Sequence, residues 1–153
     1  MAIALVDLLD ENQIVLNLKA RTRDDAMAEL IDVLANNRKI DNREKFLAQV
    51  CAREKTNSTY GADGVAFPHA RTDLANEMAL AAGRSEAGIP WTGRGEIAHL
   101  IFLIAVPEKL ITDYLVLIGA IARATKDQPL RTLLLHAETP QEFIATMLSA
   151  PSI

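Results

Sequence analysis

The first third of the chain carries the pattern of one strand and two helices. Residues 14–18 (IVLNL) alternate apolar and polar positions, which is typical of a half-buried strand. Thr22, with Asp25 three positions later, is a typical helix start, and apolar residues at helical spacing continue until 36–37. A second helix is predicted over residues 41–54, with an apolar stripe along one face.

The polar stretch that follows, residues 55–67, is predicted to be mainly loop, with a brief sheet pairing at Val65 and Ala66. Beyond it we expect two strands, a turn between them and three helices. The predicted strands are 78–84 and 97–106, the turn is 89–96, and the helices are 113–125, 129–136 and a last one from 140. The second strand is apolar throughout, as in a strand buried on both faces.

Two predictions concern how these helices are buried. The helix over residues 113–125 is apolar almost all round, so we expect it to be well buried. In the last helix, Phe143, Met147 and Leu148 are predicted to face inward.

The mixture of elements predicts the fold class. The chain has 153 residues, half of them apolar, which suits one domain with a sizeable core. It contains no internal repeat or linker. We therefore predict a single domain over residues 1–153 of the α/β class, in which a mixed β-sheet is flanked by helices on both faces in a three-layer α/β/α arrangement.

Charge and cysteine content narrow the function. The net charge of −4, with no block of basic residues, argues against a nucleic-acid partner. Cys51 is the one cysteine, so no internal disulfide forms and a reducing cytoplasm is expected. The N-terminus lacks the pattern of a signal peptide, and the longest apolar runs fall far short of the ~20 residues that span a bilayer. We expect a cytoplasmic protein without membrane insertion.

The candidate chemistry lies in GADGVAFPHAR, residues 61–71, where His69 follows Pro68 directly. Gly61 and Gly64 allow backbone N–H groups to approach a ligand, and such groups bind anions well. Pro68 restricts the backbone and presents the imidazole rigidly.

Polar side chains around His69 fit the same chemistry. Ser58 and Thr59 add hydroxyl donors, and Arg53 and Arg71 flank the segment. A neutral imidazole is a competent nucleophile, and arginine binds phosphate oxygens with paired hydrogen bonds. The residues alone predict a phosphoryl acceptor, while an ordinary surface histidine in a loop remains the alternative.

Residues 53–71, REKTNSTYGADGVAFPHAR, resemble the signature of phosphotransferase-system enzyme IIA proteins of the fructose/mannitol type, which include the nitrogen-regulatory enzyme IIA. The matching positions, without a gap, are Arg53, Glu54, Ser58, Thr59, Gly64, Val65, Ala66, Pro68, His69 and Arg71. The resemblance extends over nearly the whole chain, including LVDLL near its start, IFLIAVP and the closing TPQEFIATML.

The resemblance implies that His69 is phosphorylated by a histidine phosphocarrier protein of the HPr type. This donor would be either HPr itself or its nitrogen-branch counterpart. Arg53 would line the site and neutralise phosphate, and Ser58 and Thr59 would donate hydrogen bonds or hold the loop. Gly64 and Arg71 belong to the same supporting set. No metal or organic cofactor is implied, and the family fold is a mixed sheet covered by helices on both sides.

Two positions depart from the family pattern. Many relatives carry a second, assisting histidine where this chain has Tyr114, whose phenol does not titrate near neutrality. Tyr114 either touches the site or simply packs, because it forms one helical stripe with Leu117, Ile118 and Ile121. Ala70 stands where glycine is common and restricts the backbone after His69.

The remaining candidates have structural interpretations. His99 and His136 are predicted to be structural or merely exposed, and no spacing links the three histidines into a zinc motif. Cys51 is predicted to pack in the core. Trp91 is predicted to plug a turn, with a partner-docking surface as the alternative.

The leading functional hypothesis is a regulatory enzyme IIA of the nitrogen type, in which phosphohistidine at position 69 switches the binding of target proteins. One alternative is a sugar-specific enzyme IIA that passes the group to a IIB protein for fructose or mannitol uptake. The other is a related binding domain that is not phosphorylated, an idea that Tyr114 supports and that Arg53 and His69 oppose.

Overall fold

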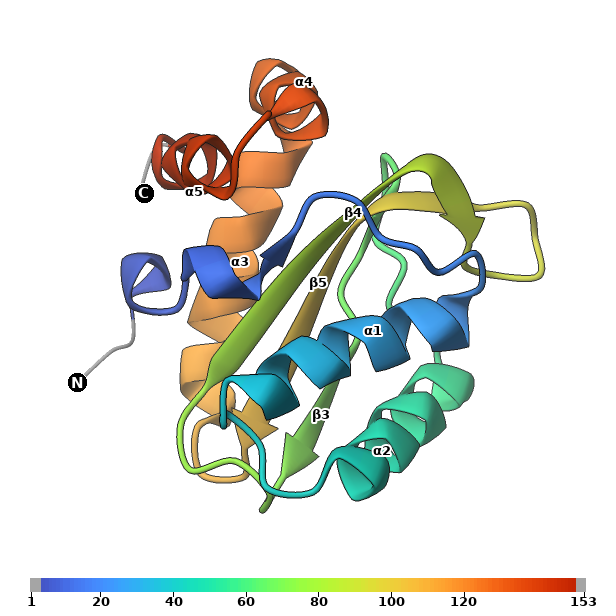
Figure 1. Cartoon of the computed structure of the whole chain (residues 1–153), viewed down its shortest axis with the longest axis vertical. Coiled ribbons are helices and arrows are strands. Elements are labelled where there is room, and N and C mark those ends of the chain that lie inside the picture. The colour runs from blue at the N-terminus through green and yellow to red at the C-terminus, as the bar shows by residue number, and fades with distance from the viewer. Residues whose placement is uncertain (1–3, 151–153) are drawn as a thin grey trace.

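In the computed structural model, which describes residues 4–150, a mixed five-stranded sheet is covered by helices on both faces (Figure 1). The predicted three-layer fold class is confirmed. The strands are β1 (Ile14–Val15), β2 (Val65–Ala66), β3 (His69–Thr72), β4 (Ala79–Pro90) and β5 (Ile97–Pro107). The helices are η1 (Leu5–Asp7), η2 (Glu11–Gln13), α1 (Arg23–Asn36), α2 (Arg43–Thr56), α3 (Ile111–Lys126), α4 (Gln128–His136) and α5 (Pro140–Leu148).

The sheet is organised around β5, the predicted central strand. It pairs antiparallel with β4 and parallel with both β2 and β3, while β1 pairs with the other side of β4. β2 and β3 follow β5 in one register, because Val65 pairs with Leu100 and His69 with Ile104. β2 and β3 therefore form one continuous extended segment along β5, with an interruption around Pro68. Proline has no N–H and cannot donate a hydrogen bond to a neighbouring strand.

The core has two halves, one on each face of the sheet. Alternate residues of β5 enter each half, as the two-residue period of a strand requires. Helices α1 and α2 cover one face, and helices α3, α4 and α5 cover the other. The buried helix residues are Met27, Leu30, Ile31, Leu34, Phe46 and Val50 on the first face, and Leu117, Ile121, Leu134, Phe143 and Met147 on the second.

The helix starts follow capping chemistry. The hydroxyl of Thr22 accepts a hydrogen bond from the Asp25 amide at 3.2 Å, as its sequence position predicted. The second helix starts later than the predicted residue 41, because Asn42 is its cap and accepts from the Lys45 amide at 3.0 Å. It also runs to Thr56, beyond the predicted end, so the loop before His69 is shorter than expected.

Several strand predictions were wrong at their edges. β1 stops at Val15 instead of residue 18, since the next carbonyl, that of Leu16, accepts from the Arg84 side chain at 3.1 Å. β4 continues through Pro90, across the start of the predicted turn, with an irregularity between Arg84 and Ile89. β3 was not predicted as a strand.

Two burial predictions were also wrong. α3 is not buried all round: Leu115 is 61% exposed and Val116 is 52% exposed, because the helix packs only one face against the sheet. Leu148 in α5 is 41% exposed, whereas Phe143 and Met147 are buried as expected. Among residues 4–150, no helix has both the length and the apolar run that crossing a membrane demands.

Gly88 in β4 provides a test of this packing. Its φ of +86° is left-handed, and an added Cβ would lie 2.5 Å from Cγ2 of Ile97. We expect Gly88→Ala to lower the free energy of unfolding by roughly 1–3 kcal/mol in urea denaturation, through backbone strain and overpacking. Gly93→Ala is the matched control, because nothing lies within 4 Å of its Cβ position. Equal stability of the two variants would contradict the described hairpin.

Candidate functional site

His69 is the first residue of β3, and the sheet fixes its backbone. It pairs with Ile104 of β5, and the carbonyl of the preceding Pro68 accepts a hydrogen bond from the Ile104 amide at 3.0 Å. Pro68 is buried, whereas the side chain of His69 is only partly buried. The histidine is thus held by a strand and still reaches the surface, which is more rigid than the loop that the sequence predicted.

The imidazole of His69 has a defined tautomer. Its Nδ1 lies 3.0 Å from the carbonyl oxygen of Phe67. Since a carbonyl only accepts, this contact assigns the proton to Nδ1. Nε2 then carries the lone pair and has no hydrogen-bond partner among residues 4–150. An unprotonated ring nitrogen with a free lone pair is the form of histidine that acts as a nucleophile.

Tyr114 of α3 lies beside the same ring nitrogen. Its hydroxyl is 3.2 Å from Nδ1 of His69, and the two ring centroids are 4.7 Å apart. Tyr114 is also buried in the core half beneath α3. The two interpretations left open by the sequence therefore hold together: the residue packs and it contacts His69. The phenol either shares the Nδ1 proton with the Phe67 carbonyl or donates to Nδ1 when that proton is absent.

Burial and charge set the protonation of this pair. Burial lowers the pKa of His69 below its ordinary value, and the charge of Arg53 lowers it further. The Phe67 carbonyl and the charge of Glu54 oppose this shift of the His69 pKa. Burial raises the pKa of Tyr114, with Arg53 opposing, so the phenol stays protonated at neutral pH. Near neutral pH the site therefore presents a neutral imidazole beside a neutral phenol.

The two arginines approach from different elements. Arg53 lies in the last turns of α2, where its Nη1 donates to the Asn57 carbonyl at 2.8 Å. Arg71 lies two residues after His69 on β3, and alternate residues of a strand share a face. Arg71 is exposed. The charge of Arg53 acts on His69, whereas Arg71 is placed only by the strand face that it shares with His69.

The hydroxyl residues divide into two roles. Ser58 is exposed, and its hydroxyl accepts from the Tyr60 amide at 3.1 Å. The hydroxyl of Thr59 instead donates to the Glu54 carboxylate at 2.5 Å. Thr59 therefore holds the loop, which was one of its two expected roles.

The N–H groups of the two glycines themselves are already hydrogen-bonded within the protein. The N–H of Gly64 donates to the Tyr60 hydroxyl at 3.0 Å, and that of Gly61 donates to the Val65 carbonyl at 2.9 Å. Both N–H groups form hydrogen bonds that stabilise the turn, so they are not available to bind an anion. The φ of Gly64 is +79°, which explains the glycine as a turn requirement. It faces His99.

Glu54 is the residue whose role the sequence did not reveal. It is 2% exposed and accepts hydrogen bonds from both Thr59 and the Trp91 indole. A signal was available: Phe46, Val50 and Glu54 are four residues apart, so Glu54 continues the buried stripe of α2. Trp91 is 2% exposed, which supports the predicted plug and excludes the docking surface.

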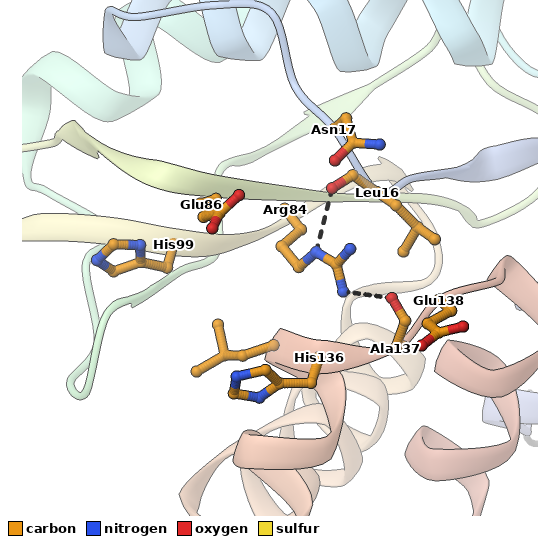
Figure 2. A pocket seen from close by; sticks show the side chains of 9 residues that line it. Leu16, Asn17, Arg84, Glu86, His99, His136, Ala137 and Glu138 are labelled. Carbon is orange, nitrogen blue, oxygen red and sulfur yellow. Dashed lines mark hydrogen bonds between the residues drawn. The ribbon is translucent and has the colours of Figure 1, made fainter.

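A large cavity lies elsewhere in the molecule and does not include His69. Its volume is about 560 Å³, and His99 and His136 are among the side chains around it (Figure 2). Arg84 is committed there to structure: its guanidinium donates to the carbonyls of Leu16, Leu134 and Ala137 at 2.8–3.1 Å. The guanidinium of Arg84 therefore holds the wall of this cavity together.

The other predicted structural residues have ordinary surroundings. His99 and His136 each direct Nδ1 to a backbone carbonyl, at 2.9 and 2.8 Å. Cys51 is half-buried, and burial raises the pKa of its thiol, which disfavours reactivity. Within residues 4–150, His, Cys, Asp and Glu side chains form no group of three or more that could hold a metal ion.

Comparison with known proteins places this chain in a family. The profile of the family "Phosphoenolpyruvate-dependent sugar phosphotransferase system, EIIA 2" matches residues 7–150. The chain belongs to this family of phosphotransferase-system enzyme IIA domains. The chain is therefore a member of a phosphoryl-carrier family.

Individual relatives come from both branches of the family. The fructose-specific EIIABC component of Bacillus subtilis is 29% identical over 92% of this chain, but this chain spans only 22% of that protein. The nitrogen regulatory protein of Bradyrhizobium diazoefficiens is 27% identical over 96% of this chain and 95% of its own length. The crystal structure of the nitrogen regulatory protein IIA-Ntr from Neisseria meningitidis superposes with a TM-score of 0.86, at 23% identity, over 94% of this chain and 98% of that one.

The electrostatics of the site give a direct test. In an NMR titration, we expect His69 to titrate below its ordinary value of about 6.5. Arg53→Gln should raise the pKa of His69, because a nearby positive charge disfavours the imidazolium. Arg94→Gln, an exposed position in the hairpin turn, should leave it unchanged. A pKa of His69 above 6.5, or the same response to both variants, would contradict the described site.

Proposed function

We propose that this chain is a phosphoryl carrier that accepts its phosphoryl group on His69 from a histidine phosphocarrier protein of the HPr type. The observation that carries the proposal is the tautomer of His69: Nδ1 is held by the Phe67 carbonyl, which leaves Nε2 free. Membership in the enzyme IIA family supports the same chemistry.

The transfer is a direct exchange between two nitrogen atoms. The lone pair of Nε2 in His69 attacks the phosphorus of the donor's phosphohistidine. A new N–P bond forms on Nε2 as the donor's N–P bond breaks, and its electron pair returns to the donor imidazole. The Nδ1 proton stays on its hydrogen bond to Phe67 during this step. Arg53 and Arg71 supply positive charge for the transferred group, which carries roughly 1.5 to 2 negative charges.

We further propose that the phosphorylated chain acts as a regulator of the nitrogen type, whose binding to target proteins depends on the state of His69. The relative from Bradyrhizobium, a nitrogen regulatory protein, supports this proposal because the alignment spans nearly all of both chains. A sugar-specific role is the second candidate. The fructose-specific relative from Bacillus, whose name includes A, B and C components, favours it, and the phosphoryl group would then pass to a IIB protein.

Labelling tests the carrier function. The protein is incubated with enzyme I, phosphoenolpyruvate and either HPr or its nitrogen-branch counterpart, and acid-labile phosphoryl adduct is measured. We expect wild type to be labelled and His69→Ala to lose all label, because the nucleophile is gone. His136→Ala is the matched control, since this exposed histidine lies at the distal cavity and should label normally. Failure with both carriers, or equal labelling of His69→Ala, would sink the proposal.

Discharge separates the two roles. Labelled protein is mixed with purified IIB proteins of the fructose and mannitol types, and loss of label is followed in time. A regulator should keep its phosphoryl group at close to the rate seen without IIB, because it has no downstream IIB acceptor. Rapid discharge to one IIB protein would instead establish the sugar-specific role while leaving the carrier chemistry at His69 intact.

A further inference from the structure

The carboxylate of Glu54 is buried without a cationic partner. It is 2% exposed, and among residues 4–150 no lysine, arginine or histidine nitrogen lies within 4 Å of it. Three hydrogen bonds satisfy it instead. They come from the Thr59 amide at 2.7 Å, the Thr59 hydroxyl at 2.5 Å and the Trp91 indole nitrogen at 3.1 Å.

Burying such a group is unfavourable unless its hydrogen bonds are complete, and apolar replacements of buried charges are often neutral or stabilising. Stability alone is therefore a weak reason for an acid at this position. Two of the three bonds go to one residue, Thr59, in the segment that leads to His69. The geometry fixes this residue at both its amide and its hydroxyl.

Thr59 in turn fixes the residue that orients His69. Its carbonyl accepts a hydrogen bond from the Phe67 amide at 3.1 Å, and the Phe67 carbonyl accepts from Nδ1 of His69 at 3.0 Å. A continuous series of hydrogen bonds therefore runs from Glu54 on α2 to the imidazole on β3. These two elements lie side by side in Figure 1.

We propose that Glu54 is a positioning residue for phosphoryl transfer, which acts through Thr59 and Phe67 to hold Nδ1 of His69 in place and Nε2 toward the donor. The proposal rests on the proposed carrier function. Glu54 touches no reacting atom in this scheme. The bond to Trp91 belongs to a separate branch, which joins α2 to the end of β4 and should matter for folding only.

Three variants separate these branches in the phosphorylation assay. Glu54→Leu keeps a similar volume but removes both acceptor oxygens, so that neither the amide nor the hydroxyl of Thr59 keeps its partner. Thr59→Val removes the hydroxyl alone, and Thr59→Ser restores it. Each of the first two should lower kcat about tenfold, the scale of one or two lost hydrogen bonds, with little change in KM for the phosphocarrier. Thr59→Ser should keep kcat within about twofold of wild type.

Trp91→Phe is the matched control for general loosening. It removes the third hydrogen bond to Glu54 and leaves the Thr59 branch intact, so kcat should stay within about twofold even if the protein loses stability. Wild-type kcat in folded Thr59→Val overturns the proposal. So does an equal fall of kcat in Trp91→Phe and Thr59→Val. If Glu54→Leu does not fold, Thr59→Val and Thr59→Ser still decide.

Nitrogen NMR of His69 provides a readout that does not need phosphoryl transfer. Glu54→Leu and Thr59→Val should shift the Nδ1–H signal and raise the fraction of the Nε2–H tautomer, whereas Trp91→Phe should not. If the wild type accepts no phosphoryl group, the carrier function fails, yet these spectra still test the hydrogen-bond series. Unchanged His69 spectra in both variants would overturn it.

Discussion

The site depends on how the chain around Pro68 pairs with β5. Successive residues of a strand direct their backbone groups to opposite sides, and the Pro68 carbonyl is directed to β5. The amide and carbonyl of Phe67 therefore point away from β5, at the outer edge of the sheet. There the amide binds Thr59 and the carbonyl binds the imidazole of His69. One edge position thus links the loop that follows α2 to His69.

This arrangement gathers the site from segments that are distant in sequence. Arg53 and Glu54 come from the end of α2, His69 and Arg71 from β3, and Tyr114 from the start of α3. The β-strand supplies rigidity, because its backbone is fixed by the most buried strand of the sheet. The helices on the two faces supply the charge and the aromatic neighbour.

Periodicity predicted the class of fold and the order of most elements because helix and strand patterns are local. The motif likewise singled out His69, Arg53 and Arg71, whose roles stay a prediction. What failed depends on partners distant in sequence or on choices within the loop. The bond from Glu54 to Trp91 spans 37 positions, and the glycine amides that resembled open donors are consumed inside their own turn. The exposure of Leu115 follows from how α3 sits on the sheet, which its composition does not encode.

The presence of Tyr114 beside His69 determines how many protons this pair of side chains binds or releases as the pH changes. A pair of histidines in contact would release protons in two coupled steps, and neither step would belong to one ring. Here the partner is a phenol whose pKa is raised by burial, so it keeps its proton throughout the range in which His69 titrates. The response of this contact pair to acid is then a single ionisation, and its midpoint reports the environment of one imidazole. The pair therefore has only two protonation states in this pH range, one with a neutral and one with a charged imidazole.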